Sequence, residues 1–162
     1  MVRTKRFFSL IFSLFVIAVL PACWETDQKN AEPKEKDFAL ISVLNKKHHD
    51  DCHIPGSVWV PFADIAQYAQ NNIDKNAEII LYCNNYMCST SGFARKKLAD
   101  LGFTNVFAYE GGVAEWLQLG YPVVGKAESA YLKNKLKTPA QTEEFVLTAQ
   151  QLKEKLESRG LI

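Results

Sequence analysis

Four short apolar segments, separated by segments of helical periodicity, constrain the fold of this chain more than any other feature. Short apolar runs bounded by turn residues are typical of buried strands, and helices between consecutive strands are typical of a parallel sheet. The predicted strands are 38–43, 58–60, 78–82 and 105–109. The predicted helices are 46–51, 64–71, 89–101 and a segment that opens at 111. The sequence therefore predicts an α/β fold, a small parallel sheet with helices on both faces.

The third predicted strand runs into a polar loop with two cysteines, and the loop runs into a helix. Cys83 directly follows the strand. Loops at the carboxyl ends of parallel strands form the crevice where open α/β sheets place their chemistry. The unpaired N–H groups and partial positive charge of a helix start favour a thiolate over a thiol. Cys83 is therefore the candidate nucleophile, expected to be ionised and reachable, although a small buried side chain is the alternative.

The other cysteine of the loop, Cys88, has two competing interpretations. It is a candidate resolving thiol that closes a disulfide with Cys83, since five residues of separation allow Cα atoms to approach within about 5.5 Å. Alternatively, its side chain only packs. Cys52 precedes a strand and is expected to be structural or unpaired.

The N-terminus carries an export signal. Arg3, Lys5 and Arg6 precede an uncharged, mostly apolar run over 7–20, which is too short to span a bilayer comfortably. The sequence that follows, Leu20-Pro21-Ala22-Cys23, resembles a bacterial lipobox, which implies cleavage after residue 22 and lipidation of Cys23. We expect an exported lipoprotein facing the periplasm, with the outer membrane favoured by Trp24. A plain signal peptide or an uncleaved anchor is the alternative.

Composition excludes some classes of function. The formal net charge of +1 over 162 residues gives no basic surface for nucleic acid. The cluster of His48, His49, Cys52 and His53 lacks the spacing of a zinc site, so no metal and no cofactor are expected. The length suits one domain with a tail.

Motifs in matching order and spacing over about 38–125 resemble a rhodanese-like domain. They are Leu40-Ile41, His53-Ile54-Pro55-Gly56-Ser57, Leu81-Tyr82-Cys83, and Tyr109-Glu110-Gly111-Gly112 with Trp116, Gly120, Pro122 and Val123. The resemblance implies that Cys83 takes up sulfane sulfur as a persulfide, and that backbone N–H groups of the following loop cradle it. Those residues are Asn84, Asn85, Tyr86, Met87, Cys88 and Ser89.

The active loop departs from the family pattern. Cys88 stands where the family often has an arginine or other donor, and no cation lies between Asn84 and Phe93. Binding of a dianion such as thiosulfate would then depend on backbone N–H groups and the helix dipole.

The domain organisation follows from these segments. Residues 1–22 are the predicted signal peptide, 23–37 a flexible polar tether, 38–125 the rhodanese-like domain, and 126–162 a charged linker with a C-terminal helix. The tail resembles the strand and first helix that normally begin a rhodanese domain, which are missing ahead of Phe38. We expect this tail to fold back and complete the domain; a free helix that binds a partner is the alternative.

Three functions remain open. The first is an exported sulfurtransferase or persulfide carrier, in which Cys83 accepts sulfur from a small donor and passes it to a thiol acceptor. The second is a periplasmic thiol–disulfide or redox protein that uses Cys83 with Cys88. The third is a non-catalytic binding module of the envelope, with an unknown protein partner.

Overall fold

The structure, a computed structural model, describes residues 37–136 and 144–162. Its sheet has four parallel strands in the order β2-β1-β3-β4. They are β1 (Phe38–Ser42), β2 (Val58–Trp59), β3 (Glu78–Tyr82) and β4 (Val106–Tyr109). Every residue of β3 is buried, as a continuous apolar run in a parallel sheet requires. The predicted α/β fold is confirmed.

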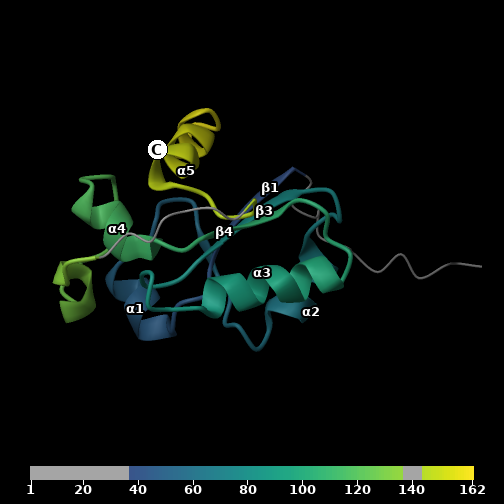
Figure 1. The fold of residues 1–162 in the computed structure, drawn as a ribbon, viewed down its shortest axis with the longest axis horizontal. Helices are drawn as coiled ribbons and strands as arrows, with labels where there is room; N and C mark the ends of the chain where they lie inside the picture. Colours follow the sequence, from purple (N-terminus) through teal and green to yellow (C-terminus); the bar gives the residue numbers. More distant parts are fainter. Residues whose placement is uncertain (1–36, 137–143) are drawn as a thin grey trace, which may run out of the picture. The chain divides into compact units, whose positions relative to one another are not determined.

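The helices lie close to their predicted positions. They are α1 (Lys46–Asp51), α2 (Ile65–Asn72), α3 (Thr90–Asp100), α4 (Gly112–Gln118), the 3₁₀ helix η1 (Ala130–Lys133) and α5 (Ala149–Glu157). Helices α2 and α3 cover one face of the sheet and α5 the other, while α1 and α4 lie near the end where the strands finish (Figure 1). The carboxyl ends of the strands are therefore surrounded by loops and helix termini.

The C-terminal tail folds back on the sheet, as expected. Val146 forms a parallel bridge with Ala108 of β4, and the bonds on either side run from Ala108 N–H to Phe145 and from Leu147 N–H to Ala108. Helix α5 opens with a capping box between Thr148 and Gln151. Its apolar face is buried through Ala149, Leu152 and Leu156. The tail thus extends the sheet beyond β4 and covers one face.

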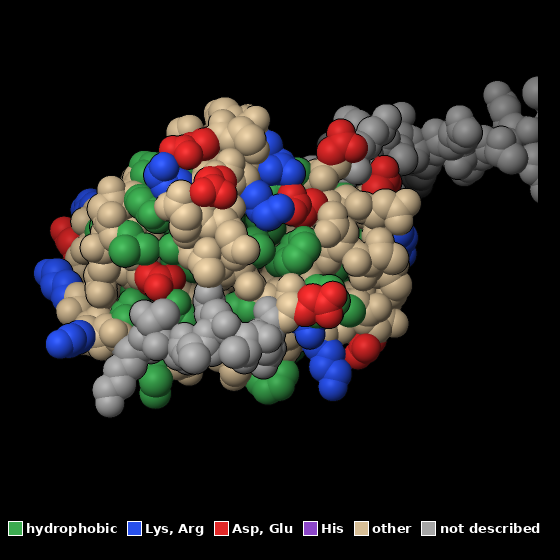
Figure 2. Space-filling model, turned by 45° about the horizontal axis from the view of Figure 1, so that its top comes forward, with side chains coloured by type: hydrophobic (Ala, Val, Ile, Leu, Met, Phe, Trp, Pro, Cys, Tyr) green, Lys and Arg blue, Asp and Glu red, His purple; other side chains and the backbone are tan. Residues whose placement is uncertain are grey.

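An ion-pair cluster fixes α5 to the beginning of β3. The carboxylate of Glu78, whose side chain is only 10% exposed, accepts hydrogen bonds from Lys155 and Arg159. Two cations on one largely buried carboxylate provide the pairing that such a charge needs. Elsewhere on this side of the molecule, positive and negative side chains are interspersed with apolar ones (Figure 2).

The predicted export signal lies outside the described residues. Residues 1–36, which include the lipidation candidate Cys23, and residues 137–143 are not described. Within the two described ranges, no helix has the length and apolar character to cross a membrane.

One residue of the short, polar helix α1 is buried. His49 is buried, its ring stacks on His53 at a centroid distance of 4.1 Å, and its Nδ1 has no hydrogen-bond partner among the described residues. Burial, and then the charge of His53, lower the pKa of His49 from 6.5 to about 4, against a smaller opposing effect of Asp50. His49 is therefore neutral in the folded protein at neutral pH.

We expect folding stability to fall as the pH drops from about 6.5 to about 4. In this window the unfolded chain binds a proton at His49 and the folded protein does not, so acid favours unfolding. The free energy of unfolding should fall by a total of roughly 2–3 kcal/mol. Urea titrations across this pH range measure the effect. His49→Gln should flatten the dependence, whereas Lys47→Gln on the exposed side of α1 should leave it intact. An equal slope in His49→Gln would contradict the assignment.

Candidate active site

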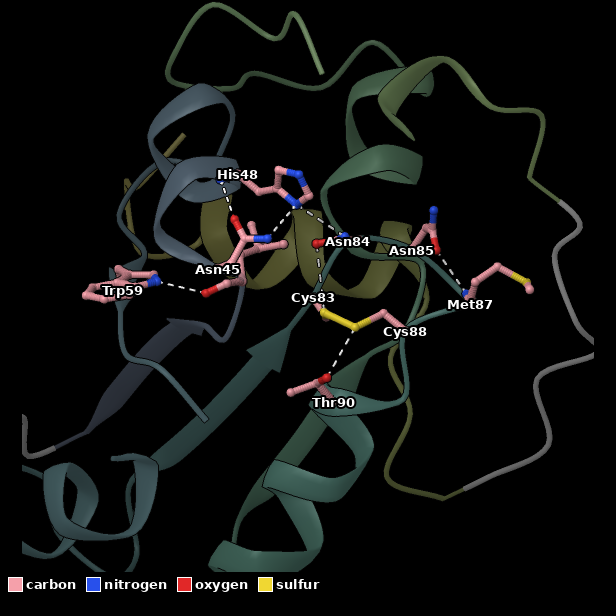
Figure 3. Close-up of a disulfide and its surroundings, with 10 residues drawn as sticks. Asn45, His48, Trp59, Cys83, Asn84, Asn85, Met87, Cys88 and Thr90 are labelled. Atoms are coloured by element: carbon pink, nitrogen blue, oxygen red, sulfur yellow. Dashed lines mark hydrogen bonds between the residues drawn. A yellow bond between two sulfur atoms is a disulfide. The ribbon is translucent and has the colours of Figure 1, made fainter. Parts of the chain in front are cut away.

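The loop between β3 and α3 carries a disulfide. Cys83 and Cys88 are bonded through their sulfur atoms, with their Cα atoms 6.3 Å apart (Figure 3). The sequence left open whether Cys88 pairs or only packs, and the structure shows the pair. The bond closes a short loop at the carboxyl end of the central strand, where the sheet places its crevice.

The exposure of the two sulfur-bearing residues differs from expectation. Cys83 was expected to be reachable, but it is only 5% exposed. Cys88 is half-buried, and Met87 beside it is 91% exposed. The expectation failed because Cys88 is bonded to Cys83 and the loop folds over the strand end. In this oxidised form, Cys88 is the more accessible member of the pair.

Asn85 accepts hydrogen bonds from two backbone N–H groups of its own loop. The Asn85 side-chain oxygen accepts from the N–H of Met87 at 3.0 Å, and its carbonyl accepts from the N–H of Cys88 at 2.9 Å. Side-chain bonds of this kind stabilise tight turns. Two of the six amides expected to cradle a sulfur ligand are therefore occupied in the disulfide form. The cradle itself remains a prediction.

Helix α4 holds the beginning of the loop. Its N–H groups at Val113 and Ala114 donate to the carbonyl oxygens of Cys83 and Asn84, at 3.1 and 3.0 Å. Gly112 has φ +61°, and a Cβ atom there would collide with the carbonyl of Cys83 and the backbone of Asn84. The glycine is required by this close approach, and the otherwise unpaired N–H groups of a helix start fix the position of Cys83.

Glu115 of α4 anchors the middle of the loop. Its two carboxylate oxygens accept from the hydroxyls of Tyr86 and Tyr109, each at 2.8 Å. Burial, and then the neighbouring charge of Glu115, raise the pKa of Tyr109 far above its ordinary range, so Tyr109 remains a donor. The carboxylate thus ties the loop to the end of β4.

A polar group on α1 lies on the other side of the disulfide. His48 Nδ1 accepts from the side-chain amides of Asn45 and Asn84, at 3.2 and 3.4 Å. Because Nδ1 accepts, the proton of the neutral ring is on Nε2. Asn84 Oδ1 is 3.9 Å from the Cys83 sulfur, which has no proton to donate in the disulfide. Sequence reasoning missed this group, since nothing in the spacing of His48 indicated contact with residue 84.

Thr90, the first residue of α3, contacts the second sulfur. Its Oγ1 lies 3.4 Å from the Cys88 sulfur. A disulfide sulfur can only accept, so the threonine hydroxyl is the donor of this bond. The sequence shows a threonine at the helix start close to the two cysteines. It does not show that the hydroxyl points toward the Cys88 sulfur.

The third cysteine of the described residues, Cys52, is unpaired and fully buried at the C-terminal end of α1. Its burial, and then the charge of Asp51, raise the pKa of the thiol to about 11.

Tyr82 fixes the predicted turn to the sheet. Its hydroxyl accepts a hydrogen bond from the N–H of Ile54 and forms another with the hydroxyl of Ser57. The described residues contain no group of three or more His, Cys, Asp or Glu side chains placed to hold a metal ion.

Comparison with known proteins agrees with this geometry. A family model described as "Rhodanese-like domain" matches residues 25–119. The rhodanese-like domain of the Alr3790 protein from Anabaena has 26% identity and a TM-score of 0.50, with 54% of this chain and 98% of that chain covered. The BH2092 protein from Bacillus halodurans has 28% identity and a TM-score of 0.51, with 56% and 65% covered. No curated protein matches the sequence. Because the family model covers more than half of the sequence, the chain belongs to the family of rhodanese-like domains.

Proposed function

We propose that this protein is a sulfurtransferase or persulfide carrier, in which reduced Cys83 accepts sulfane sulfur from a small donor and passes it to a thiol. The observation that carries this proposal is the place of Cys83, between the end of β3 and the start of α3. The helix dipole of α3 favours a thiolate there, and the thiolate is the form that attacks a sulfane sulfur.

The surroundings of the loop bear on the kind of donor. The nearest cation along α3, Arg95, lies over the ring of Phe145 at 5.0 Å, on the side of the tail. Arg95 also lines a hollow of about 230 Å³ together with Ser89, Gly92 and Glu110. Since a carboxylate shares the hollow with the guanidinium, the hollow offers no net positive charge that would select thiosulfate, a dianion, over other donors of sulfane sulfur.

Intact-mass measurement of the reduced protein tests the proposal. After anaerobic incubation with sodium tetrasulfide, Cys88→Ser should gain about 32 Da, the mass of one sulfur atom bound to Cys83. The double variant Cys83→Ser/Cys88→Ser should gain nothing, because both cysteines of the loop are then absent. If Cys88→Ser never takes up sulfur while it remains folded, the proposal is wrong.

The disulfide supports a second candidate, a thiol–disulfide redox protein. Cys83 and Cys88 already form the bond that such a protein makes and breaks. This function predicts exchange of the bond with a dithiol and no sulfur uptake by either single-cysteine variant. Non-reducing peptide maps of protein equilibrated at several redox potentials would exclude it if the 83–88 bridge never appears.

For the cellular setting we propose export and tethering through a lipidated Cys23, which rests on the signal sequence alone. An oxidising compartment would favour the disulfide. Radiolabelled palmitate incorporation, and its loss in Cys23→Ala, tests the anchor. A non-catalytic binding module is the remaining alternative, and full retention of the cellular phenotype by Cys83→Ala would favour it.

A further inference from the structure

The reach of Cys88 determines which sulfur atom it can attack. Its Sγ is bonded directly to Cys83 Sγ, and the loop between them accommodates this with internal bonds from Asn85. In a persulfide, Cys83 Sγ is the inner sulfur, and the transferred atom is attached to it. The backbone therefore allows Cys88 to attack the inner sulfur and expel the outer one.

The exposure of the site favours this internal attack over transfer to an outside thiol. Cys83 is 5% exposed in the disulfide form, so a bulky external acceptor reaches its sulfur less readily than a small sulfur donor does. Cys88 is held within the same short loop, with a Cα–Cα distance of 6.3 Å. Well-oriented groups within one molecule reach effective concentrations of about 10⁵ M or more, far above the concentration of any thiol in solution.

Thr90 favours the attacking form of Cys88. Its hydroxyl donates to the Cys88 sulfur at 3.4 Å in the disulfide. The same donor can stabilise a Cys88 thiolate, because a hydrogen bond to the charged form lowers the cost of ionisation. Thr90 also belongs to the first turn of α3, where the helix dipole acts in the same direction.

We propose that this protein reduces sulfane sulfur to hydrosulfide, with Cys88 as the resolving nucleophile. This inference rests on the proposed sulfur uptake by Cys83. In the step, Cys83–S–S⁻ and Cys88–SH give the Cys83–Cys88 disulfide and HS⁻. The bond between the inner and outer sulfur breaks, the bond between the two cysteine sulfurs forms, and the proton of Cys88 leaves on hydrosulfide. The two cysteines are oxidised and the outer sulfur is reduced.

The cycle then needs a dithiol reductant. Cys88 is the more exposed sulfur, so the reductant attacks there and Cys83 leaves as a thiolate. The second thiol of the reductant resolves the mixed disulfide, so one dithiol is oxidised for each hydrosulfide released. Cys83 returns to the form that accepts sulfur.

The test compares the reduced full-length protein with three variants, free of added reductant and oxygen. Each protein receives sodium tetrasulfide below one equivalent, and the double variant Cys83→Ser/Cys88→Ser serves as the blank for sulfide that comes from the donor. Trapping with monobromobimane measures hydrosulfide, and intact mass measures the protein. Wild type should lose about 2 Da and release one hydrosulfide per disulfide formed, whereas Cys88→Ser should hold about 32 Da and release none above the blank. Cys52→Ala should behave like wild type.

Each other outcome overturns the inference in a distinguishable way. If Cys88→Ser holds the added sulfur and wild type holds it equally without releasing hydrosulfide, the resolving step is wrong and the proposed function survives. A wild-type disulfide without matching hydrosulfide also overturns the step. If neither Cys88→Ser nor Cys88→Ala gains sulfur while folded, the proposed function fails and the inference fails with it.

Discussion

Gly112→Ala is expected to destabilise the protein by about 2–5 kcal/mol and to abolish sulfur uptake by Cys83. The left-handed backbone at φ +61° costs alanine about 1–2 kcal/mol, and the added methyl collides with the backbone at Cys83 and Asn84, where crowding costs about 1–3 kcal/mol more. The collision separates α4 from the loop and breaks the bonds that Val113 and Ala114 donate. Urea titration and intact mass after tetrasulfide treatment measure the two effects.

Gly102→Ala is the matched control. Gly102 also has a positive φ, +83°, but a Cβ atom there would meet nothing within 4 Å. This substitution should cost only the backbone strain, about 1–2 kcal/mol, and leave sulfur uptake unchanged. Equal losses of stability and of uptake in the two variants would show that the contact between Gly112 and Cys83 does not position the loop.

In the reduced, folded protein, Cys52 should react with iodoacetamide at least about a hundredfold more slowly than Cys88. Its pKa is raised from 9.0 to about 11, which alone lowers the thiolate fraction about a hundredfold near neutral pH. Its side chain is also fully buried, so alkylation requires opening of the structure. Timed quenching at neutral pH followed by peptide mapping reads each cysteine separately.

The control for this measurement is the same reaction in concentrated urea, where Cys52 should react as fast as the other cysteines. Equal rates in the folded protein would mean that Cys52 is accessible and that a second disulfide partner must be considered. Protection of Cys52 limits exchange within the domain to Cys83 and Cys88.

Much of the fold could be predicted because the strands are continuous apolar runs. The boundaries of β3 were predicted to the residue, since Glu78 and the loop after Tyr82 delimit an apolar segment. The C-terminal helix was likewise predicted, and α5 begins with a cap at Thr148 and buries a regularly spaced apolar face. Burial of His49 was missed because a single histidine in a short polar helix carries no periodic signal.

The sequence predicted where the site lies in the fold, but not whether its two cysteines are bonded to each other. A thiol after a strand and before a helix follows from local sequence, so Cys83 and Cys88 were the right residues to single out. Whether Cys88 would turn toward Cys83 depends on loop torsions that Asn85 sets. The contacts of His48 with Asn84 and of Glu115 with Tyr86 depend on which helices pack beside the loop. Partners that lie 36 and 29 residues apart leave no local pattern in the sequence.

The tail has a consequence for how the molecule folds. Arg159 meets Glu78 across 81 residues of sequence, and Val146 completes the edge of β4. Contacts of such separation form slowly, because the entropy of closing a long loop is lost before the contacts repay it. Until residues 144–162 have been synthesised, the outer edge of β4 is unpaired and the sheet face beneath α5 is bare. The nascent domain therefore requires protection from aggregation until this segment has joined it.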